Sequence, residues 1–313
     1  MGSYAEPKIP IFKFNEASLT PGSSSWKLTS DSVRRALETY GCLVVSNEKT
    51  RPEHPHESLF SVLAEVFDLP DETKKKYTSQ LGGFGYGGRY PRMPHLEYFG
   101  IEDEGDFEGV KNFTTLMWPH GNDKFCETIC SHSKTLVVQV NETIMKMVTS
   151  SYGLEKYNDW LSESSFYMIR LIKYNSPNSS ESSTGLRAHK DKGFVSVLCS
   201  NEIEGLQLQN RDGEWMDFQQ SPSKFIVLAG EALTAWSNGR IHSPTHRVIT
   251  RGFKERYCLG VFGFVGGMVQ VPQELVDDQN PLKFKPFDNI DFIQYCKDGG
   301  STIDHAIQSY CGI

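Results

Sequence analysis

The sequence predicts an α+β, mainly β fold: a double-stranded β-helix (jelly-roll) core with an N-terminal α/β region and flanking helices. Three observations support this prediction. Many short apolar runs separated by turn residues fill the second half of the chain, as in double-sheet β proteins. Strand-like and helical patterns alternate in the first hundred residues. The longest helical pattern spans residues 126–152, and its apolar stripe predicts a helix packed against the core.

Composition and charge argue against a membrane or nucleic-acid partner, and we expect a cytoplasmic monomer. The chain has 313 residues, of which 38% are apolar, so it can bury a substantial core. A net charge of −7 and a pI near 5.8 argue against nucleic acid. No run approaches the roughly 20 apolar residues of a membrane span, and the first residues lack a secretion signal. The seven scattered cysteines are odd in number, which indicates reduced cytoplasmic thiols.

Four regions of one globule are expected along the chain. They are an N-terminal α/β region at 1–120, a long supporting helix and link at 121–165, the jelly-roll core at 166–270, and a C-terminal helical segment at 271–313. The N-terminal region is expected to hold strands at 9–14 and 41–47, and helices at 30–40, 59–69 and from Asp71 onward. Ser30 or Asp31 is expected to cap the first helix, and Lys74, Lys75 and Lys76 to form a solvated helix end.

The core region is expected to consist of short strands. A strand at 166–174 precedes a loop at 176–185 that is too polar for the core. Further apolar or alternating runs predict strands at 195–199, 206–209, 214–216, 225–228, 233–236 and 256–264. Asp212 and Gly213 predict a tight hairpin turn. A short link is expected at 159–165 and a closing helix within 287–295.

A glycine-rich stretch at 82–88 is a second feature of the N-terminal region. It lacks the strand-then-helix frame and the Lys-Ser/Thr ending of a phosphate loop. Glycine with aromatic residues suits a flexible loop or strand edge at a pocket mouth, with Tyr86 and Phe107 as candidate substrate contacts. The alternative is that these aromatics only pack the two halves together.

His189, Asp191 and His246 form the candidate metal site. In an extended strand, His189 and Asp191 share a face because alternate side chains point the same way. The wide gap before His246 allows several strands to run out and return to the same ion. Two imidazoles and one carboxylate match the facial triad of non-haem iron(II) enzymes. In isolation, the His-Lys-Asp tripeptide is better explained by a histidine that caps a turn and an acid that faces solvent.

Arg256 and Cys258 follow on one face of the predicted strand at 256–264. A guanidinium matches a carboxylate through two hydrogen bonds. Because a buried unpaired charge is costly, Arg256 requires an anionic partner. That partner is either an internal acid or a bound dicarboxylate.

These motifs resemble those of plant 2-oxoglutarate- and iron(II)-dependent dioxygenases, and the resemblance spans nearly the whole chain. The His-x-Asp motif, the distal His-Arg-Val and a variant of the Arg-x-Ser motif at Arg256 fall in the family's order. Tyr174 lies where the family has a tyrosine that helps to hold the co-substrate. Cys258 departs from the family's serine. Residues 238–244 and 309–313 are most similar to the glucosinolate side-chain oxygenases, the group that produces alkenyl and hydroxyalkyl side chains.

The resemblance implies both a reaction and its cofactors. His189, Asp191 and His246 would bind Fe²⁺, and Arg256, Tyr174 and Cys258 would bind 2-oxoglutarate, with dioxygen as the second co-substrate and ascorbate as a reductant. The organic substrate would be a small plant specialised metabolite, with Tyr86, Phe107 and Phe264 as candidate contacts. Hydroxylation, desaturation and oxidative dealkylation all remain open. We expect the thiol of Cys258, a weak donor, to weaken co-substrate binding.

Three other interpretations of the function remain open from the sequence. A non-catalytic small-molecule binder would keep the pocket without needing all three metal ligands. An iron oxygenase with another co-substrate is compatible with Cys258. A jelly-roll hydrolase or isomerase would bind zinc or manganese and release no succinate.

Overall fold

A large antiparallel sheet forms the centre of the molecule. The computed structural model describes residues 9–46, 56–177, 179–219, 221, 223–299 and 305–313. The strands of the large sheet are β1 (Ile11–Phe12), β2 (Cys42–Ser46), β3 (Gly85–Tyr90), β4 (Met93–Asp103), β5 (Ser165–Tyr174), β7 (Val195–Ser200), β10 (Lys224–Ala229) and β12 (Arg256–Val265). Their order is β1-β2-β10-β7-β12-β5-β4-β3, and only β1 and β2 pair in parallel.

A smaller sheet completes the core. Its strands are β6 (Ser179–His189), β8 (Leu206–Gln209), β9 (Trp215–Asp217) and β11 (His246–Gly252), in the order β6-β11-β8-β9. The strands β13 (Met268–Val269) and β14 (Phe287–Asp288) form a separate two-stranded sheet. One apolar cluster contains side chains from both larger sheets, so the two sheets pack face to face. The predicted double-stranded β-helix is confirmed.

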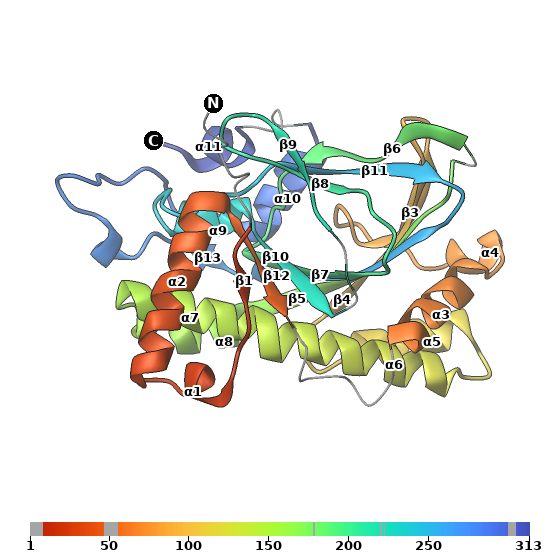
Figure 1. Ribbon diagram of the computed structural model, residues 1–313, viewed down its shortest axis with the longest axis horizontal. Helices are drawn as coiled ribbons and strands as arrows, with labels where there is room; N and C mark the ends of the chain where they lie inside the picture. The colour runs from red at the N-terminus through yellow and green to blue at the C-terminus, as the bar shows by residue number, and fades with distance from the viewer. Residues whose placement is uncertain (1–8, 47–55, 178, 220, 222, 300–304) are drawn as a thin grey trace, which may run out of the picture.

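Helices from the first half of the chain cover the other face of the large sheet. The helices are α1 (Glu16–Leu19), α2 (Ser24–Tyr40), α3 (His56–Phe67), α4 (Asp71–Lys74), α5 (Glu108–Met117), α6 (Asp123–Lys134), α7 (Thr143–Tyr152), α8 (Asn158–Ser164), α9 (Glu231–Trp236), α10 (Asn289–Lys297) and α11 (Ala306–Cys311), with the π-helix η1 (Thr135–Glu142) and the 3₁₀ turns η2 (Glu155–Tyr157) and η3 (Gln273–Leu275). Figure 1 shows α6 and α7 as one long helix beneath the strands, with α2 crossing its end. The predicted long helix is confirmed, and its apolar stripe at Leu136, Val140 and Ile144 is buried. No helix in the described ranges is long and apolar enough to cross a membrane.

The large sheet separates two apolar layers. Because side chains alternate along a strand, β5 sends Ile169 and Leu171 into the layer shared with the helices. The same strand sends Ile172 and Tyr174 into the layer between the sheets. The metal-ligand candidates border this second layer.

Several predicted elements are corrected by the structure. The first long helix, α2, begins at Ser24 rather than near Ser30, because the side chain of Ser23 accepts a hydrogen bond from the Trp26 N–H and caps it. It ends at Tyr40 and is capped by Gly41, whose φ of +69° suits glycine. A Cβ at Gly41 would lie 2.3 Å from the His242 carbonyl oxygen. Asn47, the predicted end of the next strand, lies outside the described residues.

Three other corrections share one cause, which is that tertiary contacts override a local pattern. The predicted polar loop at 176–185 belongs largely to β6, an edge strand whose serines face outward while its backbone pairs with β11. The apolar run at 233–236, predicted as a strand, lies in α9, where every residue except Thr234 is buried. The predicted link at 159–165 is mostly α8. A short apolar run does not distinguish a buried strand from a buried helix.

Lys74 is a further correction, because it is not solvated. Its side chain is only 2% exposed and its Nζ lies 2.5 Å from Glu97 Oε1 on β4. It also donates to the Phe67 carbonyl oxygen at 2.9 Å. Glu97 is far enough along the sequence that a local pattern cannot reveal the pair. Lys75 and Lys76 are exposed, as predicted.

Candidate metal centre and its cavity

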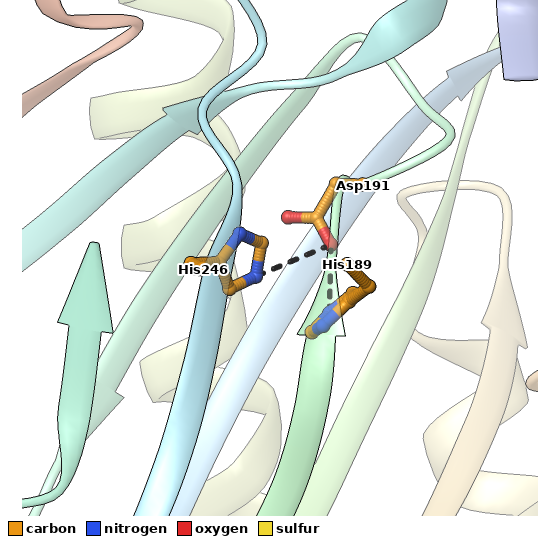
Figure 2. Close-up of side chains that lie close together, drawn as sticks. All are labelled: His189, Asp191 and His246. Atoms are coloured by element: carbon orange, nitrogen blue, oxygen red, sulfur yellow. Dashed lines mark ion pairs between the residues drawn. The ribbon is translucent and has the colours of Figure 1, made fainter. Parts of the chain in front are cut away.

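Three side chains meet at one end of the paired strands β6 and β11. His189 ends β6, His246 begins β11, and the two residues are direct partners in the antiparallel ladder. Asp191 lies two residues beyond β6, so its placement depends on the turn rather than on the strand alternation that the sequence suggested. The ligand atoms of all three residues lie within 4.8 Å of one another. Figure 2 shows both imidazoles turned toward the Asp191 carboxylate, with each Nε2 at 3.7 Å from Oδ1.

Backbone carbonyls orient both imidazoles. His189 Nδ1 lies 2.8 Å from the Arg187 carbonyl oxygen, and His246 Nδ1 lies 3.2 Å from that of Pro244. A carbonyl oxygen only accepts, so each Nδ1 carries the proton and each Nε2 presents a lone pair to the centre. The Glu231 N–H donates to the Asp191 carbonyl oxygen at 2.8 Å and fixes the backbone beside the carboxylate. The three ligand atoms are therefore preorganised for a cation.

The protonation states of two of these side chains also suit a cation. Burial, together with the neighbouring His246, lowers the pKa of His189 to about 3, so the imidazole is neutral at physiological pH. Burial opposes ionisation of Asp191, but the two histidines outweigh it and hold the pKa of that carboxyl below its usual range. Asp191 Oδ2 is buried and has no hydrogen-bond partner among the described residues. Two nitrogens and one carboxylate, with an oxygen left unsatisfied, form a donor set that fits Fe²⁺.

A cavity of about 380 Å³ adjoins the three ligands, which is within the range of small-ligand pockets. The volume includes space open to solvent. Its lining comes from β5, β6, β7, β8, β11 and β12, and consists of Arg170, Ile172, Tyr174, Leu186, His189, Asp191, Leu198, Leu206, His246, Val248, Arg256, Cys258 and Phe262. The cavity therefore brings together all the metal and co-substrate residues that the sequence indicated.

Arg256 is buried in this cavity without an internal acid. The residue is 3% exposed, its guanidinium lies 5.2 Å from the centre of the Tyr174 ring, and the two residues are cross-strand partners. Its Nε has no hydrogen-bond partner, and no described carboxylate forms an ion pair with it. Burial raises the pKa of Tyr174 to about 12, so its hydroxyl keeps its proton. Of the two partners that the sequence allowed for Arg256, the structure favours a bound anion.

Cys258 lies two residues along β12 from Arg256 and is 1% exposed. It lines the same cavity and is the cross-strand partner of Ile172. Burial raises the pKa of its thiol, although Arg256 acts in the opposite direction. The thiol occupies the position at which the hydroxyl of the family's serine is expected.

The three predicted substrate contacts do not meet in the cavity. The Tyr86 hydroxyl donates to Glu97 at 2.7 Å, and its ring packs on Phe99 in the helix-side layer. Phe107 precedes α5 with φ of +65° and packs against the same layer. Phe264 lies on the cavity face of β12 but packs on Phe166, with ring centres 5.3 Å apart. Tyr86 and Phe107 pack within the protein, in agreement with the alternative interpretation of these aromatic residues.

Arg170 lines the cavity and was missed by the sequence analysis. It lies four residues before Tyr174 on β5, so the period of two that places Tyr174 in the cavity places Arg170 there as well. That signal was present in the sequence.

Comparison with known proteins agrees with the geometry. Residues 165–264 match the model of the 2OG-Fe(II) oxygenase superfamily, and residues 9–98 match that of the N-terminal region of non-haem dioxygenases in morphine synthesis. The probable 2-oxoglutarate-dependent dioxygenase AOP1 of Arabidopsis thaliana is 37% identical over 297 residues, covering 92% of this chain and 96% of that protein.

A second relative and one solved structure extend the comparison. The 2-oxoglutarate-dependent dioxygenase AOP2 of Arabidopsis thaliana is 26% identical, covering 98% of each protein. The crystal structure of the rice dioxygenase for auxin oxidation superposes with a TM-score of 0.80 at 25% identity, covering 98% of this chain and 100% of that one. The chain therefore belongs to the plant 2-oxoglutarate- and Fe(II)-dependent dioxygenases, in the group that contains the AOP proteins.

Proposed function

We propose that this protein oxidises a C–H bond of a small plant specialised metabolite at the site formed by His189, Asp191 and His246. The products would result from hydroxylation, desaturation or oxidative dealkylation. One observation carries the proposal: Arg256 is buried in the same cavity as this His-Asp-His cluster, and no described acid neutralises it. Such an unpaired cation beside the metal ligands suits an anionic co-substrate such as 2-oxoglutarate.

His189, Asp191 and His246 would hold the iron through two Nε2 atoms and the carboxylate. When bound, iron supplies dioxygen activation, with 2-oxoglutarate converted to succinate and carbon dioxide. The carbonyl oxygens of Arg187 and Pro244 fix the tautomers, so neither imidazole needs to reorganise when the ion arrives. Three protein ligands would leave other coordination positions of the ion open to co-substrates.

Arg256 would bind the far carboxylate of 2-oxoglutarate through its planar fork. The protonated hydroxyl of Tyr174 and the thiol of Cys258 are the nearest additional donors on the same face. Because Arg256 is 3% exposed, a carboxylate bound to it is shielded from water, which strengthens the pair. The apolar walls Leu206 and Val248 exclude water and leave the organic substrate to be positioned by shape.

We further infer that the protein works as a monomer in the cytoplasm. All seven cysteines lie in the described residues and none of them forms a disulfide, which suits a reducing compartment. Light scattering of the purified protein and imaging of a fluorescent fusion test these two points separately.

An anaerobic titration of the ferrous protein with 2-oxoglutarate tests the site assignment. Chelation of the iron by the keto acid produces a weak visible charge-transfer band, and we expect this band in the wild type. Arg256→Ala should require at least about tenfold more 2-oxoglutarate, because a charge-assisted pair contributes about 1.5–3 kcal/mol. Arg251→Ala, which removes an exposed arginine on β11 outside the cavity lining, is the matched control and should titrate as the wild type does.

Two results would contradict the proposal. An iron-loaded wild type without the band would show that the co-substrate is a different acid, in line with Cys258, or that the site no longer turns over. A normal titration of Arg256→Ala would show that another group holds the far carboxylate.

A further inference from the structure

A second cavity lies on the helix side of the large sheet. Its volume is about 480 Å³, including space open to solvent, and this is within the range of small-ligand pockets. Four of its walls, Met145, Leu161, Phe194 and Val265, belong to the helix-side apolar layer. None of the proposed metal or co-substrate residues lines it. The cavity is therefore separate from the one that would hold 2-oxoglutarate.

Small side chains leave this space unfilled. Alternate residues of β12 face the helices, and in this row Gly263 stands between the buried Val261 and Val265. Gly263 lines the cavity, as do Ser162 on α8 and Ser165 at the start of β5. The apolar layer is thus interrupted where the cavity lies, and a ligand could complete it.

A π-helix forms one wall. The last two residues of η1, Asn141 and Glu142, line the cavity, and π-helical turns occur often at functional sites. Asn141 is 5% exposed and its Nδ2 donates to the Val195 carbonyl oxygen at 2.9 Å. Its Oδ1 accepts no hydrogen bond from the described residues. The wall therefore holds an acceptor that a ligand hydroxyl could use.

Tyr167 adds a hydroxyl and an aromatic ring. It is buried on the helix side of β5 and lines the cavity. Burial raises the pKa of Tyr167, and the Glu142 carboxylate acts in the same direction, so the hydroxyl keeps its proton. Together with Phe194, this ring provides aromatic walls, which favour a ligand ring in offset or edge contact.

The charges at the cavity favour a neutral ligand. Among the described lining residues, Glu142 and Lys146 are the charged ones, and they pair with each other, with Nζ 3.7 Å from Oε2. Their side chains are 34% and 52% exposed, which places them at the rim. An anion would meet the Glu142 carboxylate and a cation would meet the Lys146 ammonium. A charged ligand would also lose its hydration on entering the apolar walls.

We propose that this cavity is a second binding site, which takes a small neutral molecule with an aromatic ring and one hydroxyl group. The ring would pack on Met145, Leu161 and Phe194. The hydroxyl would exchange hydrogen bonds with Asn141 and Tyr167. This inference goes beyond the proposed function and does not depend on it, because no metal or co-substrate residue takes part.

The experiment measures binding to the full-length protein, loaded with iron and kept without oxygen. The probes are 2-phenylethanol, ethylbenzene, phenylacetate and phenethylamine, which share a ring and differ at the other end. Their affinities are measured by calorimetry and by ligand-observed NMR. For this cavity, we expect 2-phenylethanol to bind about 2- to 10-fold more tightly than ethylbenzene, because of its hydrogen bonds. It should bind at least about tenfold more tightly than either charged probe.

Three variants locate the binding. Met145→Trp fills the cavity with a larger ring and should weaken 2-phenylethanol at least about tenfold. Val138→Trp is the matched control, because it places the same ring on the exposed side of η1, outside the lining, and should bind as the wild type does. Tyr167→Phe keeps the ring and should weaken 2-phenylethanol about 2- to 10-fold while leaving ethylbenzene unchanged.

Only the binding that Met145→Trp removes is assigned to this cavity, so a probe held near the metal ligands does not count. Circular dichroism and thermal unfolding show whether each variant is folded. If Met145→Trp is not, Ser162→Trp, which narrows the rim from an exposed position, replaces it.

Three results would overturn the inference: no binding of 2-phenylethanol by the wild type, equal binding by the wild type and the filled variant, or a charged probe that binds this cavity as tightly as the alcohol. The anaerobic 2-oxoglutarate titration should be the same in all of these variants. Failure of this inference and failure of the proposed function are therefore observed in separate measurements.

Discussion

The two faces of β5 and β12 differ sharply in chemistry although they belong to the same strands. On the helix side, Ile169, Leu171 and Leu259 are fully buried in a continuous apolar layer. On the inner side, Arg170, Tyr174 and Arg256 line a cavity beside the metal ligands. Because strand side chains alternate, a one-residue step along either strand moves from a residue that stabilises the fold to one that serves the site.

This difference has an energetic consequence. Around Leu171 and Leu259, the helix-side layer is complete without any ligand, because apolar side chains satisfy one another. The inner face holds two arginines whose anionic partners the described chain does not supply, and a buried unpaired charge destabilises the folded state. Ligands that neutralise them should therefore stabilise the protein, since binding to the native state alone shifts the folding equilibrium.

The largest effect is expected at the metal ligands. His189→Ala leaves two of three protein ligands, and we expect the loss of iron binding and of detectable turnover. The free energy of unfolding of the metal-free protein should change little, because the side chain of His189 is 30% exposed and lies at the cavity rather than in a packed layer. Metal analysis after gel filtration and thermal unfolding of the metal-free variant measure the two quantities.

The exposed His120→Ala provides the control for this prediction and should retain the iron content of the wild type. If His189→Ala keeps stoichiometric iron and turns over, the ligand assignment is wrong. If the metal-free His189→Ala variant unfolds, then His189 on the inner face is needed for stability, and the proposed difference between the two faces does not hold at this residue.

On the helix side the expected effect is on stability instead. Leu171 is fully buried between Leu259 and Phe99 on the adjacent strands. Leu171→Ala should lower the free energy of unfolding by about 2–5 kcal/mol, because it removes apolar contacts and leaves a cavity. Its affinity for 2-oxoglutarate should match that of the wild type. Denaturant unfolding and the anaerobic titration test both parts, and a tenfold loss of 2-oxoglutarate affinity would show that the faces are coupled.

The same contrast explains what the sequence could and could not reveal. His189, Asp191, His246 and Arg256 were identified correctly as lining one site, because their residue types and order carry the chemistry directly. The strand β6 and the helix α9 were not, since their conformations depend on pairing and burial by distant segments. Lys74 was misjudged for the same reason, because its partner Glu97 belongs to another element.

The cavity residues differ in how readily they could be predicted from the sequence. Tyr174 was assigned from the resemblance, and strand alternation alone would have added Arg170. The absence of an acid beside Arg170 could not be foreseen, because it depends on the register that sets Gly100 and Gly260 opposite it. Tyr86 was placed at the pocket mouth from composition, whereas the β3–β4 pairing directs it to the helix side.

The smallest expected effect compares two buried cysteines on opposite faces. Cys258 lies on the inner face of β12, and Cys199 lies on the helix-side face of β7, each 1% exposed. Cys258→Ser replaces a weak donor with a hydroxyl near the proposed carboxylate position, so the affinity for 2-oxoglutarate should rise by about 2- to 10-fold. Cys199→Ser places a hydroxyl in an apolar layer and should lower the free energy of unfolding without changing that affinity.

The anaerobic charge-transfer titration and denaturant unfolding of both variants give the two readouts. An unchanged or weaker affinity in Cys258→Ser would mean that the thiol does not face the co-substrate, or that the cavity has adapted to sulfur by moving the carboxylate away. A tighter affinity for 2-oxoglutarate in Cys199→Ser would contradict the separation of the two faces, because a residue on the helix side would then affect co-substrate binding. The comparison therefore separates a local hydrogen bond from a general effect of replacing sulfur by oxygen in this sheet.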